Sequence, residues 1–221
     1  MNIDIKGEIE VIKKLFKLFL GNTIASFGVV CLIKSGLGAF AITSANQTFA
    51  SLLPISLGMA GFIVETLIMI AVLCMGEGIS IASIVNMSYG SFMIDVFNAI
   101  LPSHPVMIIG LLVVGIGWML MDKSELGNTN SNLLMTALIK KTGKSVGLIR
   151  AIEECIFLAI GFIGGYATWF TLALSLGLGY LLDFEYRLFK HDPSKMNHSY
   201  LIKGKCRNEV TELAISKESK E

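Results

Sequence analysis

Long apolar stretches alternate with short polar breaks over most of the chain. A transmembrane helix needs about 20 mostly apolar residues, because each residue rises ~1.5 Å and the hydrocarbon is ~30 Å thick. Breaks at 76–78 and 102–105 contain the glycine and proline typical of turns. Six stretches are approximately long enough: 12–33, 56–75, 79–101, 105–121, 146–164 and 167–189. The pattern predicts an all-α, polytopic membrane protein with about six transmembrane helices.

Two further segments, 39–53 and 128–141, are shorter and more polar. Their hydroxyl and amide side chains are Thr43, Ser44, Asn46, Gln47 and Thr48 in the first segment, and Asn128, Asn130 and Asn132 in the second. We predict that both segments form short re-entrant helices. The alternative is an eight-span arrangement in which both segments cross the membrane.

Charged side chains are scarce in the first half and frequent near the C-terminus. Residues 18–121 hold only four of them, whereas residues 185–221 hold fourteen. The formal net charge is +1 and 53% of the residues are apolar. The chain therefore lacks the excess of basic charge that binding to phosphates requires, and nucleic acid is not an expected partner. The expected surroundings are a lipid bilayer.

The distribution of Lys and Arg predicts the orientation, because these residues stay on the cytoplasmic side of membrane spans. They gather before the first stretch, around the central loop and after the last stretch. Six spans place all three groups inside, whereas eight spans place Lys123 outside. We therefore predict a cytoplasmic segment 1–11, membrane halves 12–101 and 105–189, and a polar cytoplasmic tail 190–221 that is partly disordered.

The chain resembles itself at a spacing of 89 residues. The sequence Lys-Ser-Gly-Leu-Gly at 34–38 recurs as Lys-Ser-Glu-Leu-Gly at 123–127, and the same register pairs Glu65 with Glu154. We interpret this pattern as an internal duplication. Because three spans is an odd number, the second half would enter the membrane from the opposite side, giving two inverted repeats. Eight spans would make the repeats parallel.

Several motifs follow a known family pattern. They are Lys34, Leu37-Gly38, Ser56 and Gly58 in the first half, and Leu126-Gly127, the run Thr142-Gly143-Lys144-Ser145-Val146, Arg150 and Glu154 in the second. In these residues the chain resembles the YczE/YyaS/YitT family of bacterial integral membrane proteins, over about residues 12–189. The resemblance implies a multi-pass protein of the bacterial inner membrane, without implying an established activity.

The first candidate site is a set of ionisable residues within the apolar stretches. Glu65 shares one helical face with Gly58 and Gly61, and Arg150 and Glu154 have an i,i+4 spacing in the second half. A charged side chain at the bilayer centre costs ~2.5–3.5 kcal/mol on insertion scales, so it needs a partner or water. We predict that Glu65, Arg150 and Glu154 meet and bind a polar solute or relay a proton. The alternative is a structural Arg150–Glu154 pair, with Glu65 as a hydrogen-bonding residue.

The second candidate site lies in the short polar segments. Asn46 and Gln47 in one, and Asn130 and Asn132 in the other, offer hydrogen bonds without charge. The N-terminus of a short helix also points backbone N–H groups at a bound anion. Ordinary hydrogen bonding between helices is the alternative.

The remaining motifs indicate no chemistry. The four cysteines and three histidines are scattered, so we expect no disulfide framework, metal site, cofactor or catalytic residue, and no enzymatic activity. We expect a small-solute transporter or permease-like protein. The alternative is a non-transporting accessory protein that binds another membrane protein.

Overall fold

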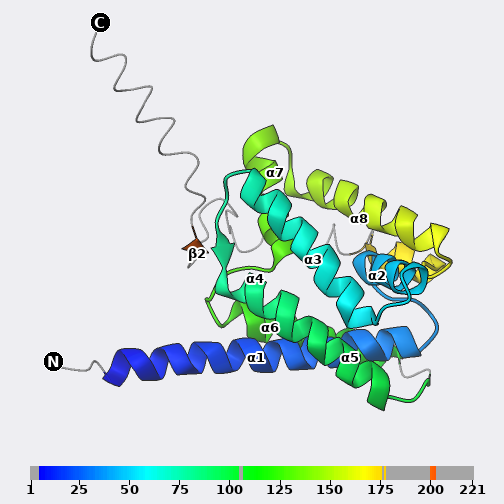
Figure 1. Ribbon diagram of the computed structural model, residues 1–221, viewed down its shortest axis with the longest axis horizontal. Coiled ribbons are helices and arrows are strands. Elements are labelled where there is room, and N and C mark those ends of the chain that lie inside the picture. The colour runs from blue at the N-terminus through cyan, green and yellow to red at the C-terminus, as the bar shows by residue number, and fades with distance from the viewer. Residues whose placement is uncertain (1–4, 105–106, 176, 178–199, 203–221) are drawn as a thin grey trace, which may run out of the picture.

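The computed structural model describes residues 5–104, 107–175, 177 and 200–202. In this part of the chain, helices dominate and a two-stranded sheet is the other regular element (Figure 1). The elements are α1 (Ile5–Lys34), α2 (Ala41–Leu52), α3 (Leu57–Cys74), β1 (Ile79–Ser80), α4 (Ile81–Val85), the π-helical turn η1 (Asn86–Gly90), α5 (Ser91–Ile100), α6 (Met107–Asp122), α7 (Asn130–Thr142), α8 (Val146–Ile163) and β2 (Tyr200–Ile202). The prediction of a helical protein is confirmed.

Two of the described helices are long and apolar enough to cross a membrane, judged by length and composition. They are the Glu8–Lys34 part of α1 and the whole of α3. A third long stretch is helical without a break but changes helix type along its length. The α-helix α4, the π-helical turn η1 and the α-helix α5 follow one another directly over residues 81–100. A π-helical turn carries one extra residue and bends the axis locally. This stretch lies within the predicted segment 79–101.

Helices α1 and α6 pack closely through glycines. A Cβ on Gly21 would lie 2.8 Å from the carbonyl oxygen of Gly117, and one on Gly28 would lie 2.7 Å from that of Gly110. Residue numbers fall along α6 as they rise along α1, so the two helices are antiparallel. Any side chain at these glycines would push the helices apart.

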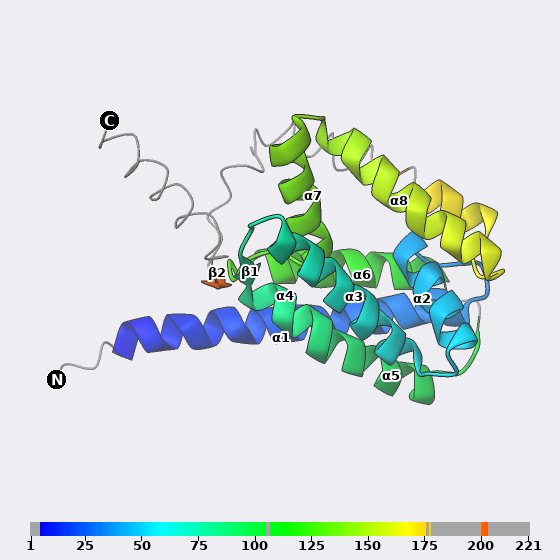
Figure 2. The ribbon, with the colours of Figure 1, turned by 45° about the horizontal axis from the view of Figure 1, so that its top comes forward.

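The short helices lie where the sequence predicts them. Helix α2 has 12 residues and α7 has 13, or about 18 and 20 Å. Figure 2 shows α2 beside α8 and α7 beside α3. The Thr48 hydroxyl of α2 donates to the carbonyl oxygen of Ile160 in α8 (3.3 Å). Each short helix therefore packs on a long helix from the other half of the chain.

The second half repeats local geometry of the first at the spacing of 89. Adding 89 to the bounds of α3 gives those of α8, and adding 89 to α2 gives 130–141, within one residue of α7. The N-cap hydroxyls of Ser56 and Ser145 both accept the backbone N–H three residues on. In the five-residue motif, the third residue has a left-handed φ in both copies, at Gly36 (73°) and Glu125 (56°).

The loops after α1 and α6 each contact the other half of the chain, and we call these two contacts the exchanged contacts. Gly38, in the first half, packs against Thr168 of the second half. Gly127, in the second half, packs against Ser80 of the first. Both glycines have a positive φ, 118° and 105°, and both approach a side chain so closely that a Cβ would overlap it.

The chain ends differ in part from the predictions. Helix α1 begins at Ile5, inside the segment predicted to precede the membrane half. Within the tail, β2 pairs antiparallel with β1, with Ile202 opposite Ile79, so residues 200–202 are not a free extension. Tyr and Ile, two of the three residues of β2, favour strand pairing where an edge is available. Most of the predicted stretch 167–189 and the rest of the tail lie outside the described residues.

Candidate functional site

At the centre of the candidate site, one arginine of α8 forms buried ion pairs with two glutamates of the same helix. Arg150 Nη1 lies 3.1 Å from Glu153 Oε2, and Arg150 Nη2 lies 2.9 Å from Glu154 Oε1. The Arg150 side chain is 14% exposed and each glutamate side chain is 7% exposed. The spacings i,i+3 and i,i+4 bring all three side chains to one face of the helix. One guanidinium therefore serves two buried carboxylates.

Helices α3 and α7 bring further polar groups to this pair. The Asn130 side chain donates to the backbone carbonyl oxygen of Glu65 (3.4 Å) and also hydrogen-bonds the Glu65 carboxylate. Ser131, the next residue of α7, lies close to the Glu153 carboxylate. The Glu65 and Glu153 carboxylates are close enough to repel each other. We call the set Glu65, Asn130, Arg150, Glu153 and Glu154 the buried cluster.

The buried cluster holds more polar atoms than its internal hydrogen bonds satisfy. Residue Glu65 is half-buried as a whole, but its Oε2 atom is buried. The buried atoms without a hydrogen-bond partner among the described residues include Glu65 Oε2, Asn130 Oδ1, Arg150 Nε, Glu153 Oε1 and Glu154 Oε2. Burying a polar atom without a partner costs free energy. The carboxylate oxygens among them are available to a proton or to a donor of a bound solute, Asn130 Oδ1 to a donor, and Arg150 Nε to an acceptor.

The cluster lies halfway along two helices. Glu65 is the ninth residue of the 18-residue α3, and Glu154 is the ninth of the 18-residue α8. The N-terminus of α7 begins at Asn130, directly beside Glu65. Because a helix N-terminus carries partial positive charge, it stabilises the nearby carboxylates of this chain. The same N-terminus is thereby less available to an external anion than the sequence suggested.

Asn46 lies one helical turn from the cluster. A Cβ on Gly61 would be 3.3 Å from Asn46 Nδ2, and Gly61 precedes Glu65 by four residues in α3. Asn46 Oδ1 is buried and has no partner among the described residues. The face of α3 that carries Gly58, Gly61 and Glu65 is therefore lined with polar groups from the neighbouring helices α5, α2 and α7.

Gln47 belongs to a different place, an open cleft of about 500 Å³ at the N-terminal end of α3. Its polar lining residues are Gln47, Ser51, Ser56, Asp95, Asn98 and Tyr166. Asp95 Oδ2 accepts from the Ser56 hydroxyl and Oδ1 accepts from the Gly58 N–H, both at 2.6 Å. Asp95 thus caps α3 while one side of it faces the cleft.

The structure gathers some predicted site residues and separates others. Glu65, Arg150, Glu154 and Asn130 come together, and Asn46 lies one turn away. Gln47 lines the cleft, and the backbone carbonyl oxygen of Asn132 accepts from the Thr136 hydroxyl within α7 (2.8 Å).

Glu153, whose carboxylate lies 3.1 Å from Arg150, was not among the predicted site residues. Its spacing of three from Arg150 is a signal that could have found it. The comparison of the two halves concealed it, because the position equivalent to Glu153 in α3 is the apolar Val64.

In the part of the chain that the structure describes, fold and site define a helical protein with two helices long and apolar enough to cross a membrane and a buried ionisable cluster. The chain belongs to a family of unknown function (DUF6198), whose model matches residues 12–106 and 102–205. No curated protein and no solved structure matches the chain. The resemblance to the YczE/YyaS/YitT family stays a prediction.

Proposed function

We propose that this protein is a multi-pass carrier of a small solute in the bacterial inner membrane, and that the buried cluster is its solute site. The observation that carries the proposal is the cluster itself. Three carboxylates and one guanidinium lie in the interior, halfway along helices α3 and α8, with several atoms unsatisfied by the described residues. Ionisable side chains inside a membrane protein indicate function unless they are fully paired.

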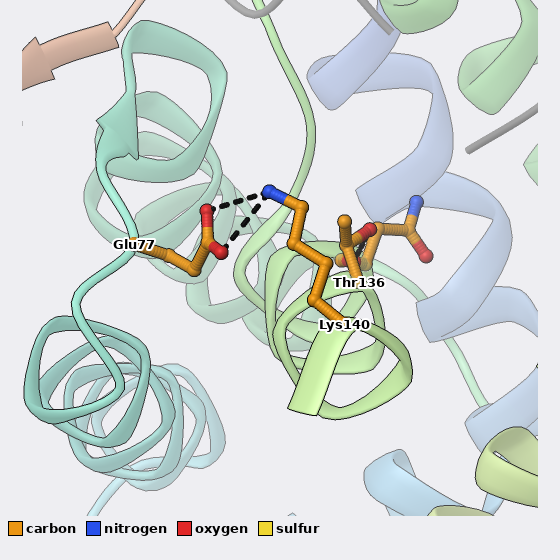
Figure 3. Close-up of polar contacts among 4 residues, drawn as sticks. Glu77, Thr136 and Lys140 are labelled. Atoms are coloured by element: carbon orange, nitrogen blue, oxygen red, sulfur yellow. Dashed lines mark hydrogen bonds and ion pairs between the residues drawn. The ribbon is translucent and has the colours of Figure 1, made fainter. Parts of the chain in front are cut away.

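A six-span arrangement with re-entrant α2 and α7 is part of this proposal, and two ion pairs support it. Lys14 Nζ lies 3.0 Å from Glu125 Oε2, and Lys140 Nζ lies 2.9 Å from Glu77 Oε2. Figure 3 shows the second pair, with both carboxylate oxygens of Glu77 facing Lys140. Six spans place all four residues on the cytoplasmic side. Eight spans would place each pair's members on opposite faces.

The path of α7 also fits a re-entrant helix. Its first residue, Asn130, touches the middle of α3 at Glu65, and Lys140 near its end pairs with Glu77, just past the end of α3. If α3 crosses the membrane, α7 begins near the midplane and ends at the face where Glu77 lies. Short helices that begin near the midplane are frequent around transporter sites.

Inverted repeats are the second part of the arrangement. The equivalent helices α1 and α6 are antiparallel, as the glycine contacts require. Parallel repeats would make them run the same way. The exchanged contacts of Gly38 and Gly127 are also those expected of two halves related by a two-fold axis. In transporters, such halves surround a site near the midplane and rock about it to open it alternately to each side.

The proposal is tested by the thermal stability of the purified full chain against a panel of metabolites and ions. A solute that binds only the folded state raises the midpoint temperature, Tm, by mass action. We expect one or more solutes to raise Tm in the wild type and to have no effect in Glu65→Gln or Glu154→Gln. Glu77→Gln, which changes a half-buried carboxylate outside the buried cluster, is the matched control and keeps the response.

Uptake of the stabilising solute into proteoliposomes then separates carriage from binding. Solute accumulation that needs Glu65 supports the carrier. A stabilising solute that is never taken up, or a panel without effect together with a co-purifying membrane protein, favours the accessory role instead.

A further inference from the structure

We infer that the solute of the buried cluster is a small cation that donates hydrogen bonds, of the ammonium or protonated primary amine class. This inference rests on the proposed function and specifies the chemistry of the same site. It comes from the charges of the cluster, from its unsatisfied atoms and from the lining of the cleft.

The charge balance of the cluster is negative. Arg150 is the cation paired with Glu153 and Glu154, and within the described residues no ion pair reaches Glu65. With the three carboxylates ionised, one guanidinium leaves two negative charges uncompensated. A buried charge without a partner is costly, so an additional cation stabilises the cluster whereas an anion is repelled.

Four of the five unsatisfied atoms of the cluster are acceptors and point the same way, and the fifth, Arg150 Nε, is a donor. Glu65 Oε2, Glu153 Oε1 and Glu154 Oε2 are buried and lack partners among the described residues, and an ionised carboxylate can only accept hydrogen bonds. Asn130 is a separate observation, because it is 0% exposed, its amide turns toward Glu65 and its Oδ1 has no partner. A primary ammonium group has three N–H donors and no acceptor, which complements this set.

The charge of the cleft at the N-terminal end of α3 is also negative. Among the described residues that line it, Asp95 is the charged one and the others are polar or apolar. From Gly58, whose N–H binds Asp95, to Glu65 is seven residues, or about 10 Å along the helix. Gly61 lies between them, with Asn46 beside it. A cation would meet carboxylates at both ends of this face of α3.

The test compares three chloride salts at equal ionic strength with the detergent-purified full chain at pH 7. Methylammonium carries a charge and N–H donors, tetramethylammonium carries the charge without donors, and potassium controls for salt. We expect saturating methylammonium to raise Tm by about 5 °C relative to potassium. Tetramethylammonium should have less than a fifth of that effect. Glu65→Gln and Glu154→Gln should abolish the shift, and Glu77→Gln should keep it.

Each other outcome is decisive. An equal shift with tetramethylammonium would overturn the requirement for donors. A shift by acetate or phosphate that Glu65→Gln removes would overturn the cation class and leave the carrier standing. No shift with methylammonium in the wild type would overturn the inference, while the broader metabolite panel still tests the carrier. If Glu65→Gln lowers Tm too far for comparison, Glu153→Gln replaces it, since it removes another carboxylate of the same cluster.

Discussion

Glu65 and Glu154 occupy equivalent positions, halfway along α3 and α8, but their surroundings differ. Glu154 has Arg150 one turn earlier on its own helix, at 2.9 Å. The position equivalent to Arg150 in α3 is Gly61, which leaves room for the neutral amide of Asn46. One half of the molecule therefore supplies a fixed positive charge, and the other supplies a carboxylate beside neutral groups. The two carboxylates cannot have the same role in binding.

The largest expected effect comes from removing the shared cation. Arg150→Met leaves Glu153 and Glu154 buried without a partner, and breaking a buried ion pair costs about 3–5 kcal/mol of unfolding free energy. We expect a drop in Tm of roughly 10 °C, measured in detergent by intrinsic fluorescence. The matched control is the triple variant that adds Glu153→Gln and Glu154→Gln, which should recover most of the loss. Equal loss in both would show that packing, and not charge, is responsible.

The next effect separates the two equivalent carboxylates. Glu154→Gln weakens a charge-assisted hydrogen bond to Arg150 and should lower stability by about 1 kcal/mol. Glu65→Gln removes a carboxylate that has no ion pair among the described residues, so its Tm in the absence of solute should equal or exceed that of the wild type. Parallel melting curves of the two variants test this. A lower Tm for Glu65→Gln than for Glu154→Gln would mean that Glu65 has a structural role.

A smaller effect is expected at the cap of α3. Asp95→Asn keeps the shape of the side chain but weakens the bonds from Ser56 and Gly58, which should cost about 1 kcal/mol or less. Thermal melting of this variant beside Ser56→Ala, which removes the hydroxyl that Asp95 binds, measures the cap. A Tm unchanged in both variants would contradict a capping role.

The smallest effect concerns the turns at 34–38 and 123–127. Both turns have a left-handed φ at their third residue, but that residue is Gly36 in one and Glu125 in the other. Glu125 hydrogen-bonds Lys14, and this bond lowers the pKa of the Glu125 carboxyl, whereas Gly36 has no side chain. Because the pKa is lower in the folded state, the stabilisation is complete above the unfolded value of about 4.3 and is lost as the pH falls through the folded value.

Stability of the wild type relative to Glu125→Gln, followed from pH 7 to pH 3, tests this pair. We expect the slightly higher Tm of the wild type to disappear toward pH 3, and to diminish at high salt because the pair is exposed. A difference that grows as the pH falls would have the wrong sign.

Much of the fold follows from local sequence patterns. Apolar runs bounded by Gly and Pro predicted α3 and α8 to within about two residues at each end, and the polar composition of 39–53 and 128–141 predicted that α2 and α7 are short. Helix bounds follow from such patterns because hydropathy and capping act over a few residues. The pairing of β1 with β2 was not predicted, since it joins residues about 120 positions apart and leaves no periodic signal.

The candidate site was predictable as residues but not as an arrangement. Spacing identified Arg150 with Glu154, whereas it could not place Asn130 of α7 against Glu65 of α3. Asn46 and Gln47 show the same difference. Successive helical residues point about 100° apart, so one lies beside Gly61 and the other lines the cleft. Which face of a short helix meets which neighbour depends on packing between distant segments.

The glycine contact between α1 and α6 affects when the two helices can pack during protein synthesis. Gly21 meets Gly117, which follows it by 96 residues. At about 5–20 residues per second, a ribosome makes the second glycine roughly 5–20 s after the first. Through that interval the glycine face of α1 has no α6 to pack on, and for most of it α1 is already complete, because α1 ends at Lys34. The longest of the described helices is therefore made well before the helix it packs on, and the assembly of this helix pair waits for the second half of the chain.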